Sequence, residues 1–196
     1  MTAMLAVLRR HGATIGKRHG RWVPLDFGSV AAEEAVCRRG VGLVERSDRA
    51  MLEIRGADVD PALRELASLG DHAWWVRLSA CRAIVRCERP DEDACIGAMR
   101  RAEDVAIVDI AAAHAALTVV GPLADAVLRA LDVEQEGVVL VVRKDPFCVE
   151  LLVGRAQGPA LWYRLLEVGE SFDIACVGVE AAERLDVSDH LSGLRR

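Results

Sequence analysis

The sequence predicts an α+β fold, in which mixed or antiparallel sheets carry helices packed on one side. Short apolar segments with a period of two, typical of strands, alternate along the chain with segments whose apolar residues recur every three or four positions, typical of helices. A strand, a glycine and then an amphipathic helix follow one another at Gly56, Gly121 and Gly158. The uneven spacing of these junctions excludes a solenoid built from equal repeats.

Length and composition favour a single domain. The 196 residues are 52% hydrophobic and 28% charged, which provides enough apolar surface for a sizeable core. No glycine-, serine- or proline-rich linker divides the chain. We therefore expect residues 1–196 to form one domain, and the paired short strands are also compatible with two intertwined lobes inside it.

Charge, apolar run length and cysteine spacing each exclude a class of protein. The net charge is −5 and no face of clustered Lys and Arg is evident, so we expect no nucleic-acid partner. No apolar run approaches the ~18–20 residues of a membrane span, and the apolar opening is too short for a signal peptide. The six scattered cysteines include no Cys-x-x-Cys pair, which favours free thiols in a reducing cytoplasm over disulfides or a metal site. We expect a cytoplasmic protein with no membrane partner and no metal.

The elements of the first half follow from periodicity and from helix-capping residues. Ser29 is a suitable N-cap, and Asp60-Pro61 is a typical helix opening. In chain order we expect a helix over residues 4–10, an irregular polar segment over 13–26, a helix over 30–39, strands over 41–44 and 51–55, and a helix from residue 60.

The second half continues the alternation of strands and helices. The apolar segment 137–143 is unbroken, which is typical of a central strand buried on both faces. The expected elements are strands over 74–78 and 81–87, an acidic turn over 90–93, a helix over 94–102, strands over 105–110 and 115–120, a helix starting at Gly121-Pro122, strands over 137–143 and 147–153, a helix over 158–169, and a further strand and helix up to residue 185.

Glu150 is the residue on which the functional argument depends. In the strand over 147–153 the period of two places Glu150 on one face with Cys148 and Leu152. A carboxylate on an apolar face either lies in water at the rim of the sheet or is a desolvated acceptor for the N–H groups of a ligand. From the residues alone, the rim position is favoured.

No catalytic motif accompanies this carboxylate. The sequence contains no phosphate-binding glycine-rich loop, its serines lack a nucleophile-elbow context, and its five histidines are far apart. Asp109, on the apolar strand over 105–110, is a second acid of the same kind as Glu150. Paired carboxylates can act as general acid and base, but sequence spacing does not determine the distance between these two.

Three groups of segments resemble, in order along the chain, the folate-binding domain of the glycine-cleavage T-protein (aminomethyltransferase) superfamily. The second group includes Leu-Thr-Val-Val-Gly-Pro-Leu-Ala-Asp-Ala-Val-Leu, which is similar to the family's G-P-x-A-x-x-v-L stretch. Each motif alone is weak, whereas the ordered set covers most of the chain. The groups are residues 8–13 with 28–44, residues 108–110 with 117–128, and residues 149–151 with 160–166 and 178–185.

This resemblance implies the T-protein-like folate-binding fold, a cofactor and a site residue. Glu150 matches the family carboxylate that hydrogen-bonds the pterin ring of tetrahydrofolate. The chemistry is suitable, because an ionised carboxylate can accept two N–H bonds from an aminopyrimidine edge. Asp109 matches a family position with a structural role. The resemblance therefore implies tetrahydrofolate as the cofactor, bound through Glu150.

Departures from the family pattern argue against a self-sufficient enzyme. The family's acidic loop corresponds to residues 74–87, which contain no Gly-Gly pair and no acid. Both arginines of the family's A-R-D-t-L-R-l-E motif are missing from their expected places in residues 181–188. We also expect the family's C-terminal domains to be absent.

The expected function is that of a shortened aminomethyltransferase-like protein of one-carbon or amine metabolism, accessory or catalytically degenerate, with no catalytic residue that we can assign. Its length and residues 108–128 are similar to the gamma subunit of sarcosine oxidase. One alternative is a non-catalytic interaction subunit that binds larger flavin-enzyme subunits or a copy of itself. The other is an active tetrahydrofolate-dependent aminomethyl- or methyltransferase.

Overall fold

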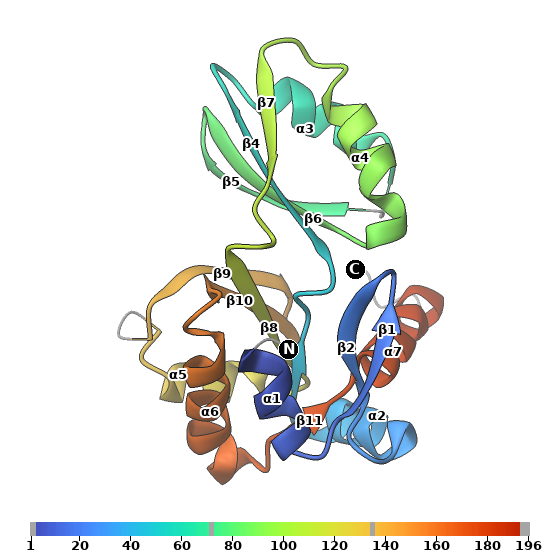
Figure 1. Ribbon diagram of the computed structural model, residues 1–196, viewed down its shortest axis with the longest axis vertical. Helices are drawn as coiled ribbons and strands as arrows, with labels where there is room; N and C mark the ends of the chain where they lie inside the picture. The colour runs from blue at the N-terminus through green and yellow to red at the C-terminus, as the bar shows by residue number, and fades with distance from the viewer. Residues whose placement is uncertain (1–2, 71–72, 134–135, 193–196) are drawn as a thin grey trace. The chain divides into compact units, whose positions relative to one another are not determined.

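The computed structural model describes residues 3–70, 73–133 and 136–192 (Figure 1). Its helices are α1 (Ala3–Arg10), α2 (Val30–Arg39), α3 (Asp60–Ala67), α4 (Glu92–Met99), α5 (Ala124–Ala130), α6 (Gly158–Gly169) and α7 (Val179–Ser192), with 3₁₀ helices η1 (Arg89–Asp91) and η2 (Glu170–Phe172). Its strands are β1 (Thr14–Arg18), β2 (Arg21–Asp26), β3 (Gly42–Glu45), β4 (Ala50–Gly56), β5 (Ala73–Ser79), β6 (Arg82–Cys87), β7 (Val105–Asp109), β8 (His114–Val120), β9 (Val138–Asp145), β10 (Cys148–Gly154) and β11 (Ala175–Val177). The predicted α+β class is confirmed.

The chain forms two compact units. Unit 1 comprises Met1–Arg46 together with His114–Arg196, and unit 2 comprises Ser47–Ala113. The sequence of unit 2 is thus inserted into that of unit 1. The expectation that residues 1–196 form a single domain stays a prediction.

Unit 1 is built on a mixed five-stranded sheet with the strand order β11-β3-β8-β10-β9. The β11–β3 pair is parallel, and the other neighbours are antiparallel. Helices α1, α5 and α6 supply the side chains that pack on one face, against residues such as Leu117 and Leu151 (Figure 1). A smaller apolar cluster joins α2 and α7 to the other face around Val44 and Val177. Helices therefore cover both faces of this sheet, and the expectation of one-sided cover is wrong for unit 1.

Unit 2 is built on an antiparallel four-stranded sheet with the order β5-β6-β4-β7. Its apolar core lies between one face of this sheet and helices α3 and α4, and it includes Leu52, Ile54, Leu66 and Met99. Because side chains alternate along a strand, Glu53 and Arg55 of β4 lie on the other face. One-sided helical cover is thus observed in unit 2.

Gly121 determines where helix α5 begins. Its φ of +123° is a conformation that residues with a Cβ rarely adopt, and a Cβ at this position would collide with the carbonyl oxygen of Gly40. The chain therefore turns at Gly121 before the helix starts at Ala124. The predicted helix exists, but its expected start at Gly121-Pro122 is too early.

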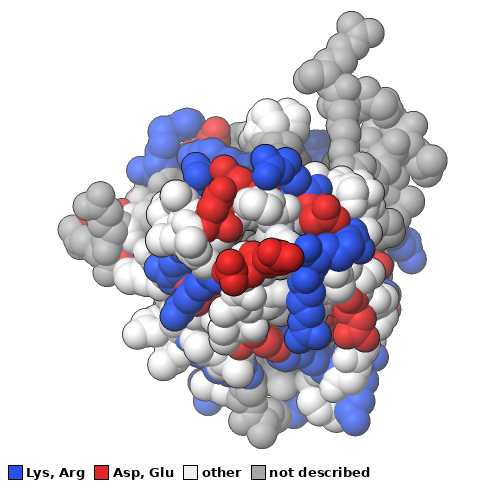
Figure 2. Space-filling view, turned by 90° about the horizontal axis from the view of Figure 1, so that it is seen from above, with Lys and Arg blue, Asp and Glu red and all other residues white. Residues whose placement is uncertain are grey.

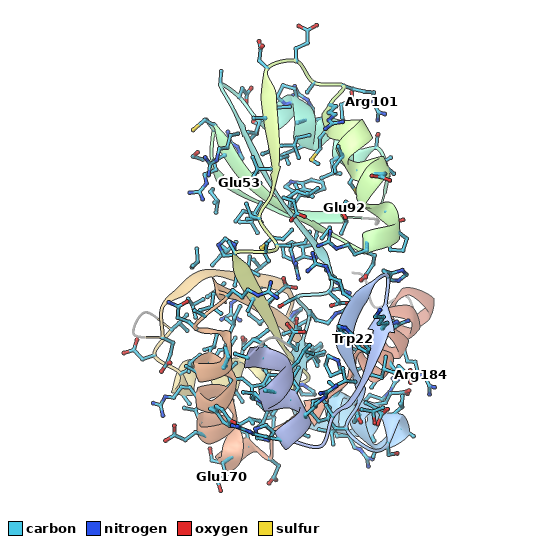
Figure 3. The ribbon with its side chains drawn as sticks, in the orientation of Figure 1. Trp22, Glu53, Glu92, Arg101, Glu170 and Arg184 are labelled. Atoms are coloured by element: carbon cyan, nitrogen blue, oxygen red, sulfur yellow. The ribbon has the colours of Figure 1, made fainter. Side chains whose placement is uncertain are left out.

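Residues 13–26 are a hairpin, not the irregular segment that we expected. Strands β1 and β2 pair antiparallel, and His19 and Gly20 form the turn with positive φ values. The polar composition Gly-Lys-Arg-His-Gly hides the alternation that normally identifies a strand. Trp22 projects from β2, where the ammonium nitrogen of Lys17 lies 5.0 Å from its ring centroid, a cation–π contact (Figure 3).

Strand β9 is an edge strand, which corrects the expectation of a central one. It pairs with β10 on one side and ends the strand order of its sheet. Val139 is 59% exposed, and Val141 is also exposed. An unbroken apolar run was a misleading signal here, because an edge strand can be as apolar as a buried one. The six cysteines, all among the described residues, are not joined in disulfides, and burial, followed by the charge of Glu33, raises the pKa of the Cys37 thiol to about 12.

None of the described helices combines the length and the apolar character that a membrane crossing requires.

Candidate functional site

Glu150 lies in the middle of strand β10, with a neighbouring strand on each side. Its antiparallel partners are Thr118 of β8 and Val142 of β9. The side chain is 0% exposed, and both carboxylate oxygens are inaccessible to solvent. The interpretation of Glu150 as a carboxylate in water at the rim of the sheet is therefore wrong.

The alternation of β10 places Glu150 opposite to the larger apolar core of unit 1. Val149, Leu151 and Val153 belong to that core, so Glu150 and Leu152 face the other way. The residues beside Glu150 across the sheet come from three other strands. We call this set the Glu150 row: Val44 of β3, Thr118 of β8, Glu150 of β10 and Val142 of β9.

Thr118 is the second polar residue of the Glu150 row. It is 6% exposed, and its hydroxyl oxygen is buried with no hydrogen-bond partner among the described residues. Because Thr118 and Glu150 are directly opposite in an antiparallel pair, their Cβ atoms lie about 4.5–5.5 Å apart. A carboxylate and a hydroxyl thus stand side by side on an otherwise apolar row.

Such a pair can recognise a polar heterocycle. An ionised carboxylate accepts N–H groups through both oxygens, and a hydroxyl can donate one hydrogen bond and accept others. Apolar surroundings strengthen these bonds, and small-molecule sites commonly combine apolar walls with a few placed polar groups. The row contains no second acid beside Glu150, so it supports binding more directly than acid–base chemistry.

Asp109, the other acid singled out from the sequence, has a different environment. It is the last residue of β7 in unit 2, and its side chain is 47% exposed. One carboxylate oxygen accepts a hydrogen bond of 2.8 Å from the backbone N–H of Ala111, and the other lies 3.8 Å from a guanidinium nitrogen of Arg89. Asp109 therefore stabilises a local turn, and it belongs to a different unit from Glu150.

Glu53 is a buried carboxylate that the sequence argument did not single out. It is 2% exposed on β4 and accepts hydrogen bonds from Arg55, at 2.6 Å, and from Arg82 of β6. Burial by itself raises its pKa, but the hydrogen bonds and charges of the two arginines outweigh burial and lower it. Glu53 is thus an ionised partner of two cations, and Figure 3 shows it among the strands of unit 2.

Glu33 is a second buried carboxylate that sequence reasoning missed. From helix α2 it accepts a hydrogen bond of 2.7 Å from the backbone N–H of Phe27 and one of 2.8 Å from that of Gly178. It therefore connects the start of α2 to the residue that precedes α7. No local pattern could have revealed this role, because Gly178 lies 145 positions away.

A cavity of about 530 Å³ lies elsewhere in unit 1, at the end of helix α6. Glu170, which lines it, is labelled in Figure 3. Three of its lining residues are acids, and the lining consists of Leu166, Glu167, Glu170, Asp173 and Ile174. Within the described part of the chain, no group of three or more His, Cys, Asp or Glu residues could hold a metal ion. None of the residues that line this cavity belongs to the Glu150 row.

The hairpin of β5 and β6 spans the residues in which the sequence departs from the family's acidic loop. Residues 73–87 contain no carboxylate. At the tip of the hairpin, the hydroxyl oxygen of Ser79 and the thiol sulfur of Cys81 form a polar contact of 3.2 Å.

On the face drawn in Figure 2, the described Lys and Arg side chains are interspersed with Asp and Glu. Positive and negative charges are therefore mixed on that face, and neither sign dominates its electrostatic potential.

Two solved structures resemble the chain over most of its length. Aminomethyltransferase T of the glycine cleavage system from Bartonella henselae matches with a TM-score of 0.68 and 18% identity, over 91% of this chain and 59% of that one. A chain of heterotetrameric sarcosine oxidase from Corynebacterium sp. U-96, in complex with pyrrole 2-carboxylate, matches with a TM-score of 0.53 and 21% identity, over 74% of this chain and 93% of that one. No family model matches the sequence, and no curated protein matches it significantly.

The chain therefore has the T-protein-like fold, which confirms the resemblance inferred from the sequence. It spans less than two thirds of the length of the Bartonella aminomethyltransferase. At these levels of identity the likeness concerns the fold, so activity and ligand have to be argued from the residues.

Proposed function

We propose that this chain is an accessory T-protein-like protein of one-carbon or amine metabolism, which binds tetrahydrofolate through Glu150 and is not a self-sufficient aminomethyltransferase. The observation that carries the proposal is the fully buried carboxylate in the centre of the unit 1 sheet, within a fold similar to that of an aminomethyltransferase.

Glu150 suits the aminopyrimidine edge of a reduced pterin. That edge presents an amino group and a ring N–H side by side, and the two oxygens of one carboxylate can accept both. Hydrogen bonds to a charged acceptor are about twice as strong as neutral ones, and they strengthen further away from water. The apolar residues Leu152, Val142 and Val44 on the same sheet face would exclude water from such a contact.

An accessory role is favoured over catalysis because residues 74–87, which correspond to the family's acidic loop, contain no acid for proton transfer. The β5–β6 hairpin lacks a carboxylate, and Glu53 of the adjacent strand is engaged by Arg55 and Arg82. A carboxylate with a lowered pKa that already accepts hydrogen bonds from two cations is a poor general base. Turnover of an aminomethyl donor by the pure protein with tetrahydrofolate would overturn this part of the proposal.

Calorimetric titration with tetrahydrofolate under anaerobic conditions tests the site. We expect Glu150→Gln to weaken binding about 10- to 100-fold, because it removes charged hydrogen bonds while keeping the shape of the side chain. Asp109→Asn is the matched control, and its affinity should stay within twofold of wild type. Undiminished binding by Glu150→Gln would exclude Glu150 as the site, and no binding by the wild-type protein would exclude a folate function.

A second candidate function is an interaction subunit of a sarcosine-oxidase-like flavin complex. It is favoured by length, because the chain covers 93% of the matched sarcosine oxidase chain but only 59% of the aminomethyltransferase. It is also favoured by the exposed apolar residues of the β9–β10 hairpin, Val139, Val141 and Phe147. An apolar edge strand of this kind is a suitable surface for a larger subunit.

Co-expression with flavoprotein genes adjacent to the coding gene tests this candidate. We expect the proteins to co-elute from a size-exclusion column, and Val141→Lys to reduce the complexed fraction because it places a charge on the edge strand. Asp109→Asn again serves as the control. A monomer that passes the column alone, with no flavoprotein gene nearby, would contradict the subunit role.

A further inference from the structure

Thr118 has a buried hydroxyl that the fold of unit 1 does not use. Its oxygen is inaccessible to solvent and has no hydrogen-bond partner among the described residues. A buried polar group without a partner is costly, and each such group in a native structure calls for an explanation. Valine at position 118 would avoid the cost of burying this hydroxyl, because it has nearly the same shape as threonine. The strand already contains valine at the next two positions, Val119 and Val120.

The position of this hydroxyl relates it to Glu150. The two residues are direct antiparallel partners, so their side chains leave the same face of the sheet as neighbours. The remaining members of the Glu150 row, Val44 and Val142, are apolar. A ligand that reaches the carboxylate of Glu150 therefore also reaches the hydroxyl of Thr118, and it meets no other polar side chain in that row.

We infer that Thr118 is a second ligand-contacting residue of the Glu150 site and helps to determine which heterocycle binds there. This inference rests on the proposed function. The matching ligand is a planar heterocycle with adjacent N–H donors for Glu150 and, next to them, a carbonyl oxygen or ring nitrogen that accepts the hydroxyl hydrogen of Thr118. The 2-amino-4-oxo pyrimidine edge of a reduced pterin has this order of groups. A purely apolar ligand leaves the hydroxyl of Thr118 without a hydrogen-bond partner.

Thr118→Val should change stability and ligand affinity in opposite directions. In the ligand-free protein the substitution removes an unsatisfied buried hydroxyl, so the midpoint of thermal unfolding should rise by about 2–4 °C. In the complex the same substitution removes a hydrogen bond to the ligand, so the affinity for tetrahydrofolate should fall about two- to tenfold. A hydroxyl with only a structural role would not give this combination, because its removal would lower the midpoint.

The experiment combines calorimetry with tetrahydrofolate and thermal unfolding of wild type, Thr118→Val, Thr118→Ser and Glu150→Gln. Thr118→Ser keeps the hydroxyl and should bind nearly as tightly as wild type, even if the valine variant folds poorly. Wild-type affinity in Thr118→Val, with weakened binding in Glu150→Gln, would overturn the role of Thr118 and leave the proposed function standing. A lowered unfolding midpoint in Thr118→Val would also overturn it. Absence of binding in all four proteins would overturn the proposed function and this inference together.

Discussion

Units 1 and 2 each bury one glutamate on the sheet face opposite to the larger apolar core, but the neighbours of the two carboxylates differ. Glu53 of unit 2 lies next to Arg55 and Arg82, which are directly opposite each other across β4 and β6. The row across the sheet from Glu150 in unit 1 contains Thr118, Val142 and Val44.

The comparison separates a structural carboxylate from a candidate binding residue. Like charges directly opposite each other in a sheet are destabilising, so Arg55 and Arg82 need the anion between them. Glu53 thus has a role that is complete within its own sheet. In its row across the sheet, Glu150 instead stands beside the hydroxyl of Thr118 and apolar side chains, and small-molecule sites commonly combine a few polar groups with apolar walls.

Removing the charge of Glu53 should have the largest effect on stability and none on ligand binding. We expect Glu53→Gln to lower the free energy of unfolding by about 1–2 kcal/mol, because it leaves two arginines facing each other. The value is at the low end for charged hydrogen bonds, since both guanidinium groups are about half exposed to water. Urea denaturation measures this change.

The same Glu53→Gln protein should bind tetrahydrofolate within twofold of wild type, in contrast to Glu150→Gln. If the substitution at Glu53 weakened folate binding as much as the one at Glu150, the distinction between the two carboxylates would be lost.

The stability supplied by Glu53 should depend on pH in a defined direction. Its folded-state pKa lies below the ordinary value of 4.5, so its contribution is fully present above about pH 4.5 and is lost as the pH falls through the folded-state pKa. Unfolding midpoints of wild type and Glu53→Gln between pH 3 and pH 7 measure this. The gap between the two proteins should be constant near neutrality and shrink in acid, whereas a gap that widened below pH 4.5 would contradict the assignment.

Substitution of Asp109 should have the smallest effect. Asp109→Asn keeps an oxygen that can accept the hydrogen bond from Ala111, and the contact with Arg89 spans 3.8 Å at a half-exposed side chain. We expect the free energy of unfolding to change by less than about 0.5 kcal/mol. A loss above 1 kcal/mol in urea denaturation would mean that the two sequence-predicted acids are more alike than their environments indicate.

Local patterns predicted those elements whose signals lie within a few residues. The period of two identified β10 and the face of Glu150, and Ser29 marked the start of α2, where its hydroxyl accepts a hydrogen bond from the N–H of Ala32. The β1–β2 hairpin was missed because its residues are polar and its geometry depends on positive φ at His19 and Gly20. Whether a strand lies at the edge or in the centre depends on how the whole sheet assembles. The sequence therefore wrongly predicted β9 to be a central strand.

The candidate site was predictable only in part. The resemblance to the T-protein family singled out Glu150 before any coordinates, but its burial and its neighbour Thr118 follow from the pairing of β8 and β10. Glu53 was overlooked because Arg82 lies 29 positions away, although Arg55 lies only two. A carboxylate within an apolar strand is a usable signal, but it cannot by itself distinguish an ion-paired residue from a ligand-binding one.

What the sequence determined by itself is the α+β class, most of the strands and helices, the T-protein-like resemblance and the strand face of Glu150. These depend on periodicity, capping residues and ordered motifs, which are local or nearly local. The burial of Glu150, its position beside Thr118 and the pairing of Glu53 with two arginines follow from the tertiary structure alone. Burial and strand pairing bring together residues that are tens of positions apart, and no local rule specifies which residues meet.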